Sequence, residues 1–184
     1  VLAGKERTAI FRSSGTTQQN RGRHFHNQAS LELYEASLVP WFKKHLLSNA
    51  PKNLGVISLT PEPRQAPESS LVHMFDVIRR RFASELEFSY FASADQEGAW
   101  KLDLNAILRA LKETIRSNHP VLILGTAFSF VHLLDGMDSV RLPPGSRVME
   151  TGGYKGRSRK IPKEELHCLI TAKLGLPLNY IVTE

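Results

Sequence analysis

The sequence contains a single cysteine, Cys168, among 184 residues. One thiol excludes a disulfide framework within the chain and a cysteine-rich zinc site, and it favours a reducing compartment such as the cytoplasm. No apolar run is long enough to cross a bilayer, and no secretory signal follows Val1, since charged residues begin at Lys5. The first residue is not methionine, so we expect a processed, trimmed or excised chain.

The chain is basic, with a net charge of +6 and an isoelectric point near 9.6. Apart from the run at residues 79–81, its basic residues are spread among acidic ones, and no aromatic-interleaved basic repeat occurs. We therefore expect no nucleic-acid partner, whereas a basic surface suits an anionic nucleotide. The length predicts one domain that is large enough to bury a core.

Apolar runs alternate with segments of helical periodicity along the whole chain. Strands are predicted at residues 54–59, 87–92, 121–124, 147–150 and 178–184. Helices are predicted at residues 30–47, 69–84, 103–118, 130–135 and 162–173. Ser69 or Ser70 is the expected cap of the second and Asp103 of the third, Gly175 is a stop, and Pro40 is expected to kink or split the first helix. Since no hairpin turn joins successive strands, we predict one α/β domain over residues 1–184, with a mostly parallel sheet and helices on both faces.

The most unusual stretch near the start combines small hydroxylated residues with two arginines. Its members are Ser13, Ser14, Gly15, Thr16, Thr17, Arg21 and Arg23. Hydroxyls and backbone N–H groups beside a glycine form a concave donor surface, and guanidiniums neutralise phosphates. The pattern indicates either a phosphate-binding loop or a flexible polar loop with a solvated basic end.

A second glycine-rich loop follows the predicted strand at residues 147–150. It contains Thr151, Gly152, Gly153, Tyr154 and Lys155. Paired glycines let a flat ring lie against the backbone, although a wide surface loop with a basic tip has the same composition. Because ligands bind beyond the carboxyl ends of parallel strands, we expect this loop and residues 125–128 to converge on one cleft.

The two loops together resemble those of a known family. Residues 13–17 resemble the Thr-Ser-Gly-Thr-Thr-Gly loop of adenylate-forming enzymes, and residues 141–166 resemble the LuxE-type acyl-protein synthetase branch of that superfamily. Residues 69–74 and 121–134 fit the same branch. The resemblance runs from about residue 11 to residue 184, as part of the family's large N-terminal domain.

The resemblance implies a ligase that activates a fatty-acid carboxylate with ATP and Mg²⁺, forms acyl-AMP and passes the acyl group to a protein thiol. It implies that Ser13, Ser14, Gly15, Thr16 and Thr17 grip phosphates and that Thr151, Gly152, Gly153 and Tyr154 flank the adenine. It also implies that Thr126, Ala127 and Phe128 line the acyl side, with His73 near it. Arg21, Arg23 and Lys155 complete the expected nucleotide site.

The chain departs from the family pattern at several points. Gln18 replaces a glycine, and the usual Pro-Lys is absent. Residues 180–184 are similar to the family motif Tyr-Gly-x-Thr-Glu, whose glutamate helps to hold Mg²⁺. Because Ile181 replaces the glycine of that motif, we interpret Glu184 as the end of a strand. The family's catalytic lysine and acyl-accepting cysteine belong to a part of the family sequence that follows the region matched here. We therefore assign no catalytic residue and interpret Cys168 as structural. We also expect little turnover from this fragment.

Other functions remain open at this point. One is a CoA ligase of the phenylacetate-CoA ligase type, because the sequence does not choose the acceptor thiol. Another is a non-catalytic nucleotide-binding module, which Gln18 and the missing lysine favour. A basic interaction domain is supported by the net charge alone.

Overall fold

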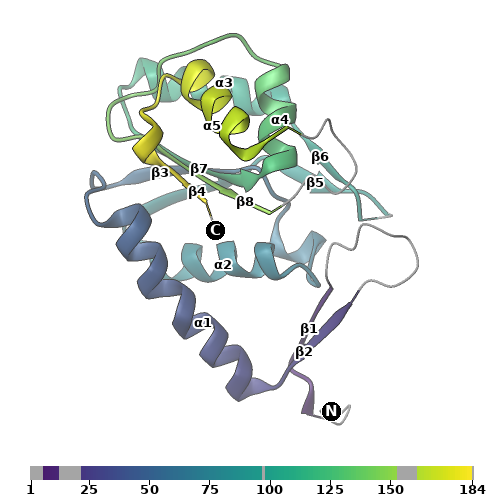
Figure 1. The fold of residues 1–184 in the computed structure, drawn as a ribbon. Helices are drawn as coiled ribbons and strands as arrows, with labels where there is room; N and C mark the ends of the chain where they lie inside the picture. Colours follow the sequence, from purple (N-terminus) through teal and green to yellow (C-terminus); the bar gives the residue numbers. More distant parts are fainter. Residues whose placement is uncertain (1–5, 13–21, 97, 153–160, 184) are drawn as a thin grey trace.

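A five-stranded parallel sheet forms the centre of the protein (Figure 1). The structure is a computed structural model, and it describes residues 6–12, 22–96, 98–152 and 161–183. The sheet order is β4-β3-β7-β8-β9, and every neighbouring pair is parallel. The strands are β3 (Leu54–Ser58), β4 (Leu86–Tyr90), β7 (Val121–Thr126), β8 (Arg147–Thr151) and β9 (Ile181–Thr183). The predicted α/β class and parallel sheet are confirmed.

Helices cover both faces of this sheet (Figure 1). On one face lie α1 (Gln28–Phe42) and α2 (Ser70–Arg81). On the other lie α3 (Leu104–Arg116), α4 (Ala127–Asp135) and α5 (Lys163–Leu174). Side chains alternate along β8, so that Val148 packs with α3, α4 and α5 while Met149 packs with α1 and α2. Both faces of the central strand β7 are buried, and its residues 121–124 are accordingly all apolar.

Local signals set most of the helix boundaries. Ser69 caps α2 and Asp103 caps α3, each accepting a hydrogen bond from a backbone N–H three residues later. Gly175 ends α5 in the left-handed conformation with φ 66°. The prediction for α4 began three residues late, because Thr126 caps the helix by accepting from the N–H of Ser129.

The first helix continues through Pro40 and then widens. Residues Lys43–Leu47 form a π-helical turn, η2, in which Leu46 is fully buried. Proline removes one backbone donor, and irregular turns near proline are an expected consequence. The Nη1 of Arg147 donates a 2.6 Å hydrogen bond to the carbonyl of Leu46, which ties the end of η2 to the start of β8.

Two antiparallel hairpins correct the prediction that none would occur. β1 (Ala9–Arg12) pairs with β2 (Arg23–His26), and β5 (Ala92–Ala94) pairs with β6 (Trp100–Leu102). Strands of three or four residues are too short to show a two-residue period, so the sequence pattern did not reveal them. The predicted strand at 178–184 is likewise shorter: Leu178–Tyr180 form a 3₁₀ turn, η4, before β9.

Candidate functional site

Hydroxylated side chains gather at the carboxyl edge of the sheet. Thr126 of β7 and Thr151 of β8 are register partners on adjacent strands. Residues two positions earlier, Leu124 and Met149, pack on the α1/α2 side, so alternation puts both threonines on that side. Thr126 and Thr151 are therefore neighbours, whereas the cleft expected between residues 125–128 and the second loop stays a prediction. Gly153, Tyr154 and Lys155 lie outside the described residues.

Some of these hydroxyls hold the edge together. The hydroxyls of Thr126 and Ser129 are 3.0 Å apart, and Ser129 Oγ donates to the carbonyl of Leu59 at 3.2 Å. Ala127 and Phe128 follow in the first turn of α4 and are only 3% and 8% exposed. Ala127 belongs to the core beside α3 and α5, on the face opposite α1 and α2. Of the residues expected on the acyl side, Thr126 and Ala127 therefore face opposite sides of the sheet.

Gly152 stands at the point where the chain leaves β8. Its φ is +70°, and a Cβ built on it would meet none of the described residues within 4 Å. The positive φ requires glycine or a strained alternative. No described side chain therefore blocks the approach of a flat ligand to this backbone.

The β1–β2 hairpin carries the first loop, and contacts of the described residues locate its open end. Arg12 forms a 2.7 Å ion pair with Glu68, and its N–H also donates to the Glu68 carbonyl at 2.9 Å. Arg23 is the register partner of Arg12 and is exposed. Ser13, Ser14, Gly15, Thr16, Thr17 and Arg21 lie outside the described residues.

Glu68 shows on which side of the sheet this hairpin end lies. It belongs to the connection between β3 and the start of α2, and α2 returns the chain to begin β4 parallel to β3. In such a crossover the helix begins at the carboxyl edge of the sheet. The loop end of the hairpin and the Thr151–Gly152 segment are therefore at the same edge.

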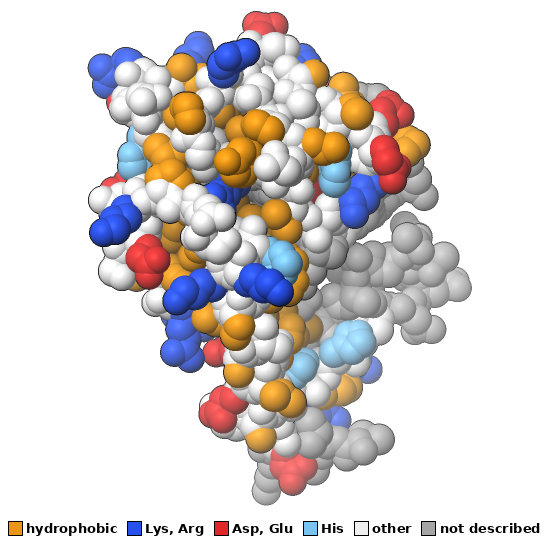
Figure 2. Space-filling view, turned by 60° about the vertical axis from the view of Figure 1, so that its left-hand side comes forward, with side chains coloured by type: hydrophobic (Ala, Val, Ile, Leu, Met, Phe, Trp, Pro, Cys, Tyr) orange, Lys and Arg blue, Asp and Glu red, His pale blue; other side chains and the backbone are white. Residues whose placement is uncertain are grey.

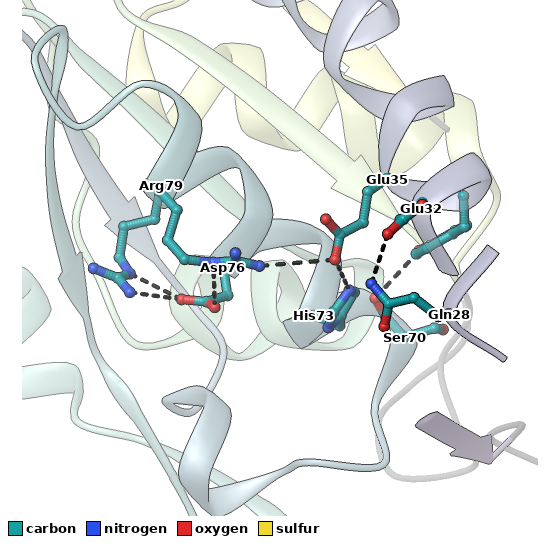
Figure 3. Close-up of polar contacts among 9 residues, drawn as sticks. Gln28, Glu32, Glu35, Ser70, His73, Asp76 and Arg79 are labelled. Atoms are coloured by element: carbon teal, nitrogen blue, oxygen red, sulfur yellow. Dashed lines mark hydrogen bonds and ion pairs between the residues drawn. The ribbon is translucent and has the colours of Figure 1, made fainter. Parts of the chain in front are cut away.

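His73 lies beside the hairpin. Its Nε2 is 2.9 Å from Glu35 Oε1, and Figure 3 shows the two side chains facing each other from α2 and α1. The His73 ring also lies 5.1 Å from that of Phe11 in β1 and stacks on Tyr34 at 6.2 Å. His73 therefore joins the hairpin to α1 and α2.

A buried polar cluster that the sequence reasoning missed lies between β8, β9 and α5. Glu150 Oε2 is 3.7 Å from His167 Nε2, which is 3.1 Å from Thr183 Oγ1. Burial raises the pKa of Glu150, partly offset by Lys163 and by a hydrogen bond from Thr183. Burial also lowers the pKa of His167; the charge of Lys163 lowers it further, and Glu164 opposes the shift. A glutamate at the end of the predicted strand at 147–150 was the available signal.

The remaining observations bound the chemistry of the described residues. Cys168 is exposed on α5. Across the part of the chain that the structure describes, no three metal-binding side chains cluster, and no helix has the length and apolar character needed to cross a membrane. No protein-family model matches the chain, and no curated protein matches it either.

Proposed function

We propose that this chain is the nucleotide-binding part of a cytoplasmic ligase that uses ATP to activate a fatty-acid carboxylate as acyl-AMP and then transfers the acyl group to a protein thiol. The first loop and Arg23 bind the phosphates, and Thr151 and Gly152 lie against the adenine. Mg²⁺ accompanies ATP, and none of the described residues is assigned to it.

One observation carries the proposal most directly. The contact between Arg12 and Glu68 brings the loop end of the β1–β2 hairpin to the carboxyl edge of the sheet, where Thr151 and Gly152 also lie. A parallel sheet binds its ligands at this edge. A donor-rich loop and an open glycine at one edge suit the two ends of a nucleotide, its phosphates and its flat base.

The proposed chemistry places distinct demands on the chain. A carboxylate oxygen attacks the α-phosphorus and pyrophosphate leaves; a thiolate then attacks the acyl carbon and AMP leaves. Negative charge accumulates on the phosphates in the first step, and an exposed guanidinium such as that of Arg23 stabilises it. The basic balance of the chain, +6, also favours capture of a polyanion.

Pyrophosphate exchange into ATP tests this function in the full-length protein. We expect exchange that depends on an added medium- or long-chain fatty acid, and we expect Arg23→Ala to reduce it. Arg109→Ala is the matched control, because Arg109 is an exposed arginine on α3. Absence of exchange with every fatty acid offered would refute acyl activation.

Two alternatives differ in the acceptor or in the absence of chemistry. A CoA ligase would release acyl-CoA when CoA replaces the acceptor protein. A non-catalytic module, favoured by Gln18 and the missing lysine, would bind ATP without any acid-dependent exchange. The same assay, repeated with CoA and accompanied by ATP titration, separates the three.

A further inference from the structure

An apolar cavity of about 200 Å³ lies between α1, α2 and the sheet. Helix α1 contributes Tyr34, Ser37, Leu38 and Trp41 to its walls. Met74 and Ile78 of α2 form the opposite wall, together with Met149 of β8. Met149 is fully buried, so the cavity reaches the surface of the sheet itself.

The two ends of the cavity lie at different distances from the proposed nucleotide site. The Tyr34 hydroxyl donates to the carbonyl of Ser70, the first residue of α2, so the Tyr34 end lies toward the carboxyl edge of the sheet. From Tyr34 to Trp41 the wall follows two helical turns, about 10 Å, toward the opposite edge. Met149 lies two residues before Thr151 on the same face, about 7 Å away. The cavity therefore begins where the proposed acyl-adenylate would be formed and runs away from it.

Its lining selects an uncharged, apolar occupant. None of the described side chains that line it is charged, and its two hydroxyls already make hydrogen bonds, Tyr34 to Ser70 and Ser37 to the Tyr34 carbonyl. An ionised or strongly polar group would lose its hydration without replacement. Figure 2 shows hydrophobic side chains in a band over the face on which α1 lies, with lysine and arginine side chains beside it.

We propose that this cavity holds the alkyl tail of the carboxylic acid, with the carboxylate at the Tyr34 end and the terminal methyl toward Trp41. This inference rests on the proposed function for the identity of the acid. It assigns the tail to the α1/α2 face of the sheet and not to the surroundings of Ala127, which packs in the core on the other face. A cavity whose α1 wall runs for about two helical turns can take a straight chain and sets an upper limit on its useful length.

The fluorescence of Trp41 reports on occupancy directly. The chain has two tryptophans, Trp41 and Trp100, so Trp100→Phe in the full-length protein leaves Trp41 as the only one in this chain. The variant is titrated with straight-chain acids from butanoate to dodecanoate and, for comparison, with phenylacetate, which carries a ring instead of a straight chain. Each added methylene should tighten binding about fourfold until the cavity is full, after which affinity should level off. Equal affinity along the series, or tighter binding of phenylacetate than of octanoate, would overturn the assignment.

A pair of substitutions on one helix supplies the control. Ser37 is exposed at the rim of the cavity, and Ser37→Phe puts a ring over its mouth; Leu33 is 72% exposed on the same helix and is not part of the lining. Ser37→Phe should weaken decanoate binding about tenfold or more, whereas Leu33→Phe should leave it unchanged. Equal decanoate affinity in the two variants refutes the cavity as the tail site.

Pyrophosphate exchange separates this inference from the proposed function. If Ser37→Phe retains the wild-type exchange rates and chain-length preference, acyl activation stands and the cavity assignment fails. If acids bind with the expected length dependence and the two variants differ as expected, but no acid supports exchange, the cavity remains an alkyl site and the ligase proposal fails.

Discussion

Replacement of Gly152 by alanine tests the nucleotide site with a control inside the same chain. Gly152 has φ +70° and Gly98 has φ +74°, and a Cβ at either position meets no described residue within 4 Å. The two glycines therefore present the same backbone requirement, and neither Cβ would touch the described part of the chain. They differ in position, because Gly152 follows β8 at the proposed adenine site and Gly98 lies in the β5–β6 turn.

The cost to stability should be the same in both variants. Holding alanine in the left-handed region costs about 1–2 kcal/mol, and the described residues add no steric contribution at either Cβ. For a chain of this size, that loss lowers the Tm by about 2–8 °C. Binding should differ, because only the methyl group at position 152 occupies the space in which the adenine lies. A clash of about 1.4 kcal/mol reduces ATP affinity about tenfold.

The assay is calorimetric titration of the full-length protein and of each variant with ATP, beside a thermal melt of the same samples. We expect similar melting temperatures for Gly152→Ala and Gly98→Ala and weaker ATP binding for Gly152→Ala alone. If both variants bind ATP as wild type does, Gly152 is only a turn residue, and the adenine does not lie against this backbone.

Three further predictions concern stability, each measured by urea denaturation. Burial raises the pKa of Glu150 above its ordinary value of 4.5, so the free energy of unfolding should fall as the pH rises through that raised pKa. Glu150→Gln should remove this fall, and a variant that follows the wild-type pH profile would contradict the prediction. His167 acts in the opposite sense, since its lowered pKa costs stability as the pH falls below 6.5, so the Glu150 contribution is read from the difference between wild type and variant. Asp103→Ala should cost about 0.5–2 kcal/mol through loss of the α3 cap, and a value near zero would mean that solvent replaces the cap. Leu46→Ala should cost about 2–5 kcal/mol of stability, because Leu46 is fully buried. Leu33→Ala, at a side chain that is 72% exposed, should change stability by less than about 0.5 kcal/mol, and similar values for both variants would refute the packing described for η2.

Long apolar patterns and strong caps were readable in the sequence. The strand cores at 54–58, 121–124 and 147–150, the cap Asp103 and the stop at Gly175 were all predicted and confirmed. Of the two candidate caps Ser69 and Ser70, the structure has Ser69. Each depends on a local cause: a continuous apolar run, a side chain that bonds a nearby N–H, or a glycine that tolerates positive φ. The short hairpins were missed because pairing over three or four residues depends on a partner strand rather than on a pattern.

The candidate site was only partly readable. The two loops were singled out by composition, but their common edge depends on the crossover through α2 and on the contact between Arg12 and Glu68, which are 56 positions apart in the sequence. His73 illustrates the same limit, since its contacts with Glu35 and Phe11 come from two other elements. The roles of Ser13–Thr17 and of Gly153–Lys155 remain predictions.

By itself the sequence determined the order of the five sheet strands and of the helices between them, and with it the parallel sheet, because strands that alternate with helices require crossovers. Only the tertiary structure decided which side chains meet: Arg12 with Glu68, Glu150 with His167, and those of α1 with those of α2 around the cavity. The physical reason is the sequence separation of the residues that take part in each interaction. Backbone conformation and capping depend on residues within one or two turns, whereas a cavity or a buried charge depends on groups that are distant in the chain and that packing alone brings together.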